Sequence, residues 1–232
     1  MGAEALARWT AEDGLQVGPD VFVRIAEEKG FVGEITRLVV SRVLRDFAEL
    51  LRANPDFRVS INVAAADLSD PEFFPMLEQA MKRAGIPARS VVIEITEGST
   101  ARRETAIETI LALRRLGHSV HIDDFGTGYS SLAYLHDLSV DAIKIDKVFT
   151  QAIGTGAAIV AILPQILAMA EALNLEVIVE GIEAEQQADY FANSGRPILA
   201  QGWLFGRPVQ AAELRTRLAK DRTRTLAPAD AA

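Results

Sequence analysis

The chain of 232 residues contains no cysteine and only three histidines. Without cysteine it can form neither a disulfide framework nor a thiolate metal site, which fits a reducing compartment. No apolar stretch reaches the ~20 residues that cross a bilayer, and the first residues lack the basic and apolar regions of a secretory signal. We therefore expect a cytoplasmic chain that makes no membrane contact of its own.

Positive charge is also scarce. The 24 Lys and Arg residues are outnumbered by 32 Asp and Glu residues, which leaves a formal net charge of −8. This balance disfavours binding to polymeric nucleic acid, although a small phosphate ligand held through metal ions is compatible with it. Aromatic residues make up only 6%, but the total apolar fraction of 49% is enough to fill a sizeable core.

Short apolar strands alternate with helix-length segments along the chain. The strand candidates lie near residues 3–8, 57–63, 90–96, 118–123, 140–145, 176–180 and 197–200. They are apolar and β-branched on both faces, which is typical of parallel strands covered by helices. The pattern predicts an α/β fold, a TIM-like barrel in one domain over residues 1–220, followed by a disordered tail at 221–232.

Helix signals fill the intervals between these strands. The predicted helices begin at Pro19 or cover residues 35–51, 70–81, 105–116, 157–173 and 184–192. We expect Asp70 to cap its helix, with Pro71 at the first helical position. Within 157–173, Pro164 should kink or break the helix, since it cannot donate a backbone hydrogen bond.

Polar side chains follow the predicted strands at their carboxyl ends, where such barrels carry their functional groups. These residues are Asn62, Glu94, Asp123, Asp124, Lys144, Asp146, Glu180 and Gln201. Carboxylate and amide oxygens suit Mg²⁺ or Mn²⁺, and the adjacent Asp123 and Asp124 can address two ions. Two metal ions suit phosphodiester hydrolysis, in which Lys144 can orient the nucleophile or offset developing charge.

Each of these residues also has a simpler explanation when taken alone. An aspartate can cap a helix, Asn62 can form a turn, and Lys144 can extend along a barrel wall. His121 precedes Asp123 by two and shares its side of the strand, yet a structural role explains it better than a metal-ligand role. Trp203 can pack on the barrel rim or stack on a base.

Seven motifs resemble, in order, those of the EAL-domain family of cyclic di-GMP phosphodiesterases. The first is EALARW at residues 4–9. The others are SINV at 60–63, EITE at 94–97, DDFGTGYSS at 123–131, IKID at 143–146, EGIE at 180–183 and QG at 201–202. A three-letter match would be worthless, whereas seven ordered motifs at barrel-length intervals, spanning residues 4 to about 208, are specific.

The resemblance implies hydrolysis of cyclic di-GMP to linear pGpG, with two magnesium or manganese ions, in a modified (β/α)8 barrel. The ligands it implies are Glu4, Asn62, Glu94 and Asp123 for one ion and Asp123, Asp124 and Glu180 for the other. It places Lys144 beside the nucleophilic water and Glu97 in support of the loop after Asp124. The residues it implies at the substrate are Arg8, Asp146, Glu183 and Gln201.

The resemblance also concerns parts of the molecule outside the active site. It implies a homodimer through the helix after Asp124, with Leu132, Tyr134 and Leu135 as interface candidates. Family members carry a helix and a strand before the first motif, so we expect a barrel that lacks both, with weakened catalysis. Residues 117–123 and 143–147 resemble a subgroup with periplasmic sensors, in which this chain would be the cytoplasmic end of a membrane-anchored parent.

Two other functions are open to a chain with these motifs. One is a receptor that binds cyclic di-GMP without cutting it, and the other is a regulatory domain that binds a protein partner. Degenerate family members usually lose a metal ligand or the lysine, and here every such position is filled. The sequence therefore favours the enzyme.

Overall fold

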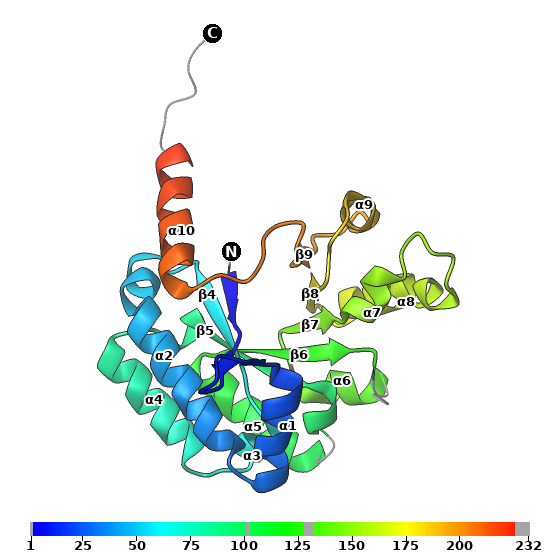
Figure 1. The fold of residues 1–232 in the computed structure, drawn as a ribbon. Coiled ribbons are helices and arrows are strands. Elements are labelled where there is room, and N and C mark those ends of the chain that lie inside the picture. The colour runs from blue at the N-terminus through cyan, green and yellow to red at the C-terminus, as the bar shows by residue number, and fades with distance from the viewer. Residues whose placement is uncertain (1, 101–102, 128–131, 226–232) are drawn as a thin grey trace.

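The computed structural model describes residues 2–100, 103–127 and 132–225. Seven strands form one parallel sheet in the order β1-β4-β5-β6-β7-β8-β9 (Figure 1). Their bounds are Gly2–Ala5 for β1, Arg58–Asn62 for β4, Val91–Thr96 for β5, Ser119–Phe125 for β6, Ala142–Ile145 for β7, Glu176–Val179 for β8 and Leu199–Ala200 for β9. The sheet curls into a half-barrel, which confirms the predicted TIM-like α/β fold.

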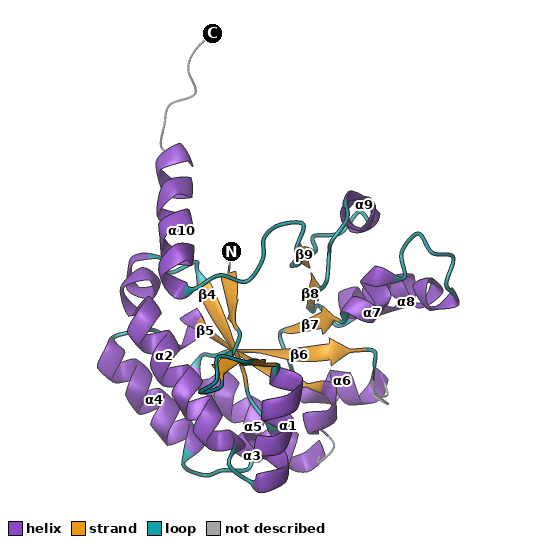
Figure 2. Ribbon diagram, in the orientation of Figure 1, coloured by secondary structure: helices purple, strands orange, loops and turns teal. Residues whose placement is uncertain are grey.

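The helices lie mostly along the outside of the curled sheet, whereas α10 projects away from it (Figure 2). They are α1 Pro19–Lys29, α2 Val32–Ala53, α3 Ala65–Leu68, α4 Phe73–Ala84, α5 Arg103–Leu116, α6 Leu132–Leu138, α7 Lys147–Gln151, α8 Leu163–Ala172, α9 Glu185–Ala192 and α10 Ala211–Thr225. Short 3-10 turns lie at Ala88–Ser90, Glu97–Thr100 and Ala158–Ile162, and strands β2 (Trp9–Thr10) and β3 (Gln16–Val17) form a separate antiparallel pair. No helix within the described ranges is both long and apolar enough to span a membrane.

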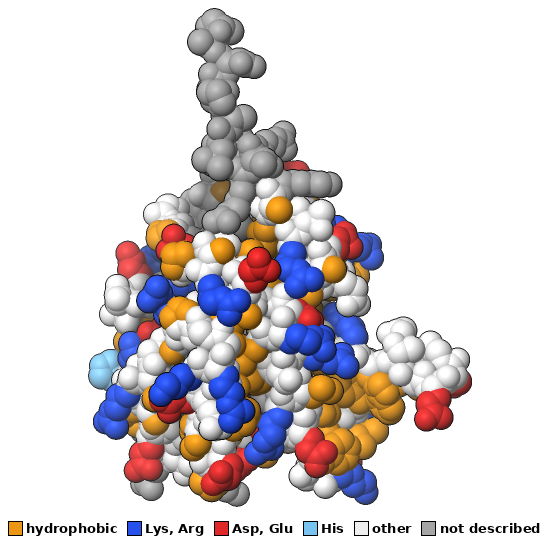
Figure 3. Space-filling model, turned by 90° about the vertical axis from the view of Figure 1, so that its left-hand side faces the viewer, with side chains coloured by type: hydrophobic (Ala, Val, Ile, Leu, Met, Phe, Trp, Pro, Cys, Tyr) orange, Lys and Arg blue, Asp and Glu red, His pale blue; other side chains and the backbone are white. Residues whose placement is uncertain are grey.

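The core lies between the sheet and its helices. Five consecutive residues of β5, from Val91 to Ile95, are buried, so both faces of this strand are covered. That is the environment for which β-branched residues on both faces are suited. On the described outer face in Figure 3, Lys and Arg side chains are interspersed with acidic and apolar ones, so this face carries no large patch of one sign.

The first residues of two helices test the predictions made from Pro71 and Pro164. Helix α4 begins at Phe73 rather than at Pro71, because Asp70 Oδ1 accepts a hydrogen bond from Glu72 N at 2.9 Å and closes a turn ahead of the helix. The prediction that Asp70 caps this helix is therefore wrong. The predicted break at Pro164 is confirmed, since a 3-10 turn ends at Ile162 and Pro164 lies in the first turn of α8.

The ends of the predicted domain also differ from the structure in detail. The first strand is confined to Gly2–Ala5, although the sequence suggested residues 3–8. Helix α10 runs to Thr225, past residue 220, where we predicted the tail to begin. Residues 226–232 lie outside the described residues.

Candidate active site

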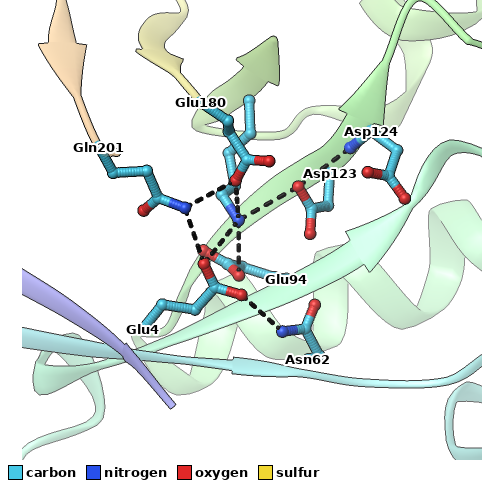
Figure 4. Close-up of polar contacts among 8 residues, drawn as sticks. Glu4, Asn62, Glu94, Asp123, Asp124, Glu180 and Gln201 are labelled. Carbon is cyan, nitrogen blue, oxygen red and sulfur yellow. Dashed lines mark hydrogen bonds and ion pairs between the residues drawn. The ribbon is translucent and has the colours of Figure 1, made fainter. Parts of the chain in front are cut away.

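Strand register brings the predicted polar residues to one rim of the sheet. Asn62 on β4 pairs with Glu94 on β5, near the carboxyl ends of both strands. Asp123 on β6 lies opposite Thr96 on β5. Because all the strands are parallel, each delivers its last side chains to the same edge. We call the side chains gathered there the rim cluster, and its members are Glu4, Asn62, Glu94, Asp123, Asp124, Lys144, Glu180 and Gln201 (Figure 4).

Lys144 lies at the centre of the rim cluster and is only 1% exposed. Its Nζ lies 2.8 Å from Glu180 Oε1, 2.9 Å from Glu94 Oε2, 3.1 Å from Asp123 Oδ1 and 3.3 Å from Glu4 Oε2. An ammonium ion has three protons, so four carboxylates more than saturate it. The sheet thus holds carboxylates from four strand ends around one fixed positive charge.

Two amides complete the inner part of the rim cluster. Asn62 Nδ2 donates to Glu4 Oε1 at 2.9 Å. Gln201 Nε2 donates to Glu4 Oε2 at 2.9 Å and to Glu180 Oε1 at 2.8 Å. Since Glu4 belongs to β1 and Gln201 follows β9, this amide joins the two edge strands of the sheet.

Burial has the largest single influence on the pKa values in the rim cluster. Burial raises the pKa of Glu94 to about 8 and that of Glu180 to about 7, while burial and the adjacent carboxylate raise the pKa of Asp124 to about 6. Burial would also raise the pKa of Glu4, but attraction to Lys144 and hydrogen bonds from two amides hold it below its usual value. Burial opposes the charge of Lys144, yet the surrounding carboxylates outweigh it and raise its pKa.

The acidic members of the rim cluster form two groups suited to a metal ion. Carboxylate oxygens of Glu4, Glu94 and Asp123 lie within 4.8 Å of one another, and so do those of Asp123, Asp124 and Glu180. Asp123 belongs to both groups. All the donors are oxygens, which hard divalent cations prefer, and such cations favour the charged form of buried carboxylates. The chemistry of the donors therefore fits two divalent cations that share one aspartate.

Comparison with known proteins agrees with this geometry. The family model of the EAL domain matches residues 1–208.

The chain belongs to the EAL domain family.

Its curated relatives are longer proteins. It is 36% identical over 207 residues to the probable cyclic di-GMP phosphodiesterase PdeB of Escherichia coli, covering 89% of this chain and 39% of that protein. It is 38% identical over 213 residues to the cyclic di-GMP phosphodiesterase NbdA of Pseudomonas aeruginosa, covering 91% of this chain and 27% of that protein. The chain thus spans well under half the length of these relatives.

Solved structures resemble the EAL domain closely. The complex of the PaMucR phosphodiesterase with c-di-GMP superposes with a TM-score of 0.85 at 30% identity, over 91% of this chain and 86% of the other. The FimX EAL domain from Pseudomonas aeruginosa bound to c-di-GMP gives a TM-score of 0.77 at 26% identity, over 86% and 80%.

A β-bulge explains how two adjacent aspartates reach the same site. Successive side chains on a regular strand point to opposite faces, so Asp123 and Asp124 would normally diverge. Here the register of β6 against β7 shifts between Ile122 and Phe125, and Asp124 adopts a positive φ of 54°. The bulge re-aims Asp124, so that its carboxylate lies within reach of Asp123 and Glu180.

The loop after the bulge is held by Glu97. The buried Glu97 carboxylate accepts a hydrogen bond from Gly126 N at 3.0 Å. This contact agrees with the expected support of the loop after Asp124. Gly126 has a φ of 95°, and a Cβ there would lie 2.7 Å from the ring of Phe149, so glycine is required on both counts.

The remaining predicted substrate residues lie at different depths. Asp146 caps α7 by accepting from Val148 N at 2.8 Å, and its carboxyl is close enough to raise the pKa of Asp124 further. Arg8 and Glu183 are exposed, and within the described residues neither side chain is bonded to the rim cluster. Gln201, predicted at the substrate, donates hydrogen bonds to Glu4 and Glu180, two of the candidate metal ligands.

The surroundings of His121 are consistent with the prediction that this residue has a structural role rather than a role as a metal ligand. The ring is buried, and its Nε2 lies 3.1 Å from Ser119 Oγ. Burial lowers its pKa to about 4, so the ring is neutral at pH 7. Neither candidate metal group among the described residues includes it.

Sequence reasoning missed two residues that position Glu180. Thr150 is fully buried and its Oγ1 donates to Glu180 O at 2.6 Å. Gln187 donates to Thr150 O at 3.1 Å, while its Oε1 accepts from Glu183 N and Ala184 N. A glutamine three residues into α9 is a capping signal that could have revealed Gln187, whereas nothing in the sequence marks Thr150.

The predicted dimer surface is wrong for Leu135, which is 3% exposed and belongs to the core of this chain. A residue buried there cannot also anchor a second subunit. Leu132 and Tyr134 lie on α6, and their side chains are outside the described part of the structure.

Proposed function

We propose that this EAL domain hydrolyses one phosphodiester bond of cyclic di-GMP and releases linear pGpG. The observation that carries the proposal is the rim cluster, in which two carboxylate groups share Asp123 beside a buried lysine. Relatives named as cyclic di-GMP phosphodiesterases, each matching about nine-tenths of this chain, support the choice of substrate.

Two magnesium or manganese ions complete the proposed site. Glu4, Asn62, Glu94 and Asp123 would hold one, and Asp123, Asp124 and Glu180 the other. When bound, such ions supply an activated water and neutralise charge at the phosphate.

In the proposed reaction, Lys144 and Glu97 have separate tasks. Water attacks phosphorus and the bond to the 3′ oxygen breaks, so that the phosphate stays on one nucleoside and a proton completes the new 3′ hydroxyl. Lys144, fixed by four carboxylates, provides a positive charge that cannot swing away as negative charge develops. Glu97 holds Gly126 and thereby the orientation of Asp124.

Substrate binding is assigned to the outer part of the rim. We propose that Arg8 and Glu183, both exposed, contact the nucleotide, and that Asp146 shapes the pocket beside Asp124. Gln201 presents its amide to Glu4 and Glu180, so its contribution is to position these carboxylates as well as to border the pocket.

The proposal includes two further properties of the protein, its oligomeric state and its location in the cell. The first is a homodimer formed around α6, for which Leu132 and Tyr134 remain the candidates. Analytical ultracentrifugation of the purified chain tests it. The second is a cytoplasmic location, either free or as the cytoplasmic part of a membrane-anchored parent, which cell fractionation tests.

The experiment for the activity combines turnover with binding. The purified chain is incubated with cyclic di-GMP and Mg²⁺, Mn²⁺ or Ca²⁺, the products are separated by chromatography, and a binding titration is run alongside. Formation of pGpG supports the enzyme. Binding without conversion would instead favour a non-catalytic receptor, and the absence of both would contradict the proposed site.

A further inference from the structure

Helix α7 supports one of the two candidate metal groups from outside the rim cluster. We call Asp123, Asp124 and Glu180 the second metal group. Thr150, in α7, donates a hydrogen bond from Oγ1 to Glu180 O at 2.6 Å, and Figure 1 shows α7 beside the ends of β7 and β8. We propose that Thr150 is a positioning residue for Glu180, and that its hydroxyl sets the affinity of the second metal group for a divalent cation. The inference rests on the two-cation site of the proposed function.

The hydroxyl of Thr150 is fully buried and has one proton to donate. Its Oγ1 lies 3.0 Å from Lys147 O and 3.5 Å from Gly181 O, so the contact with Glu180 O is the shortest of the three. Water does not readily replace a donor that belongs to a buried side chain, and an acceptor that loses its donor there is penalised. Without the hydroxyl, the peptide after Glu180 is therefore expected to shift.

The backbone around Glu180 leaves little freedom apart from this bond. Glu180 N donates to Ile145 O at 3.1 Å, and the next residue, Gly181, turns the chain with a φ of 67°. A Cβ at Gly181 would lie 2.5 Å from Lys147 Cβ and 3.3 Å from Thr150 Oγ1, so α7 packs directly against this peptide. A change in the contact with Thr150 is thus transmitted to the Glu180 side chain.

Gln187 extends the support to the start of α9. It is 9% exposed, its Nε2 donates to Thr150 O at 3.1 Å, and its Oε1 accepts from Glu183 N at 2.7 Å. The loop from Glu180 to Glu183 is therefore tied to Thr150 at both ends, through the threonine hydroxyl at one end and through Gln187 at the other.

The support from α7 reaches only one of the two metal groups. The other group consists of Glu4, Glu94 and Asp123, and does not include Glu180. Among the described residues, the Thr150 hydroxyl bonds only to Lys147 and to residues 180–181. Partners that orient a metal ligand typically change metal affinity about 10- to 100-fold. Loss of the hydroxyl should therefore weaken the binding of one cation and leave the other unchanged.

The test counts bound Mn²⁺ by electron paramagnetic resonance at room temperature, which detects the free ion and needs no turnover. Mn²⁺ is titrated into the metal-stripped wild type, Thr150→Val, Thr150→Ser and Asp124→Asn. Asp124→Asn removes a charged donor from the second metal group alone, so it identifies the binding step of the second cation. Thr109→Val is the matched control, because the buried Thr109 hydroxyl also donates to a backbone carbonyl, Leu68 O, which is not part of the rim cluster.

Valine keeps the size and branching of threonine but lacks the hydroxyl. We expect Thr150→Val to weaken the second step about 10- to 100-fold and to leave the first step unchanged. Thr150→Ser, which keeps the hydroxyl, should stay near the wild type, and Thr109→Val should change neither step. Circular dichroism checks the fold of each variant. If Thr150→Val does not fold, Thr150→Ala takes its place in the comparison with Thr150→Ser.

Three results would overturn the role of Thr150. They are an unchanged second step in Thr150→Val, equal weakening of both steps, and a loss in Thr150→Ser as large as that in Thr150→Val. A wild type that binds fewer than two Mn²⁺ would refute the two-cation site, and the inference with it. Two binding steps with the expected loss in Thr150→Val, but no pGpG formation, would refute the hydrolysis alone.

Discussion

At the scale of single residues, Lys144 provides the positive charge that offsets the carboxylates of the rim cluster. It is the cation bonded to four carboxylates that come from different strands, and its side chain is almost completely buried. Removing one partner of a buried charge network leaves the other charges uncompensated, which costs more than the network itself contributes. The same residue therefore matters for the stability of the fold and for the proposed chemistry.

Replacing Lys144 by Met tests this dual role. In a metal-chelating buffer we expect the free energy of unfolding to fall by about 3 kcal/mol, because four buried carboxylates lose their counter-charge. Urea denaturation measures it, with the exposed Lys147→Met as the matched control, for which little change is expected. Millimolar Mg²⁺ should return part of the lost stability. An unfolding midpoint equal to that of the wild type contradicts the account.

The shared aspartate provides the sharpest test of the metal groups. Replacing Asp123 by Ala removes a donor from both groups, so kcat/KM should fall by at least about 100-fold, the loss typical of damage to a metal site. The same is expected for Glu4→Ala, and circular dichroism should show an intact fold. The exposed Asp189→Asn serves as the control. Full activity of either alanine variant would refute the site assignment.

His118 makes the stability of the domain depend on pH. Its ring is buried, Nδ1 lies 2.9 Å from Val91 O, and burial lowers its pKa. Above pH ~6.5 the ring is neutral in both folded and unfolded chains and has no effect. As the pH falls from there towards the lowered folded-state pKa, only the unfolded chain takes up the proton, and stability is lost by up to about 1.4 kcal/mol per pH unit.

The pH effect is measured by urea unfolding at pH 7.5 and 5.5. Replacing His118 by Asn, which keeps a donor near Val91 O, should make the loss of stability between these values smaller. His136→Asn is the control at an exposed site, since the His136 side chain is 74% exposed. Equal pH dependence in the wild type and the His118 variant would show that His118 does not contribute.

At the scale of secondary-structure elements, the carboxyl end of β6 is decisive. A regular strand would separate Asp123 from Asp124, and the shift in register with the positive φ of Asp124 brings both to the site. Gly126 also has a positive φ, and the ring of Phe149 on α7 packs beside it. The geometry of the second metal group therefore depends on the packing of a neighbouring helix.

Gly126→Ala should reveal that dependence. The positive φ alone costs about 1 kcal/mol for alanine, and overlap with the buried Phe149 ring adds about 1–3 kcal/mol. Gly156→Ala is the control, because Gly156 has a similar φ of 78° but nothing within 4 Å of its added Cβ. We expect the Gly126 variant to lose more stability than the control, measured by urea unfolding, and to lose turnover as well. Equal effects would mean that the packing against Phe149 is unimportant.

The elements also show which parts of the site could be predicted. Alternation of apolar strands with helices and the polar residues at strand ends are local patterns, so the parallel sheet and its rim follow from them. The bulge after Ile122 and the contacts of Thr150 and Gln187 depend on packing between distant segments, which no local pattern encodes. The burial of Leu135 was missed for the same reason.

At the scale of the whole molecule, the site unites the two edges of an open sheet. Within the described residues, no strand pairs with the outer edges of β1 and β9, yet Gln201 after β9 bonds to Glu4 in β1. The net charge of −8 disfavours general binding of phosphates. The proposed anionic dinucleotide would therefore be attracted locally, by divalent cations at the rim cluster together with Arg8.

The central claim is that this domain cuts cyclic di-GMP in a reaction that depends on divalent cations at the rim cluster. The most direct measurement is the initial rate of pGpG formation by metal-stripped protein as Mg²⁺ or Mn²⁺ is added, resolved by chromatography. We predict no product in the chelated protein and a rate that rises and saturates with added metal. A folded protein that binds cyclic di-GMP but forms no pGpG at any metal concentration would contradict the claim.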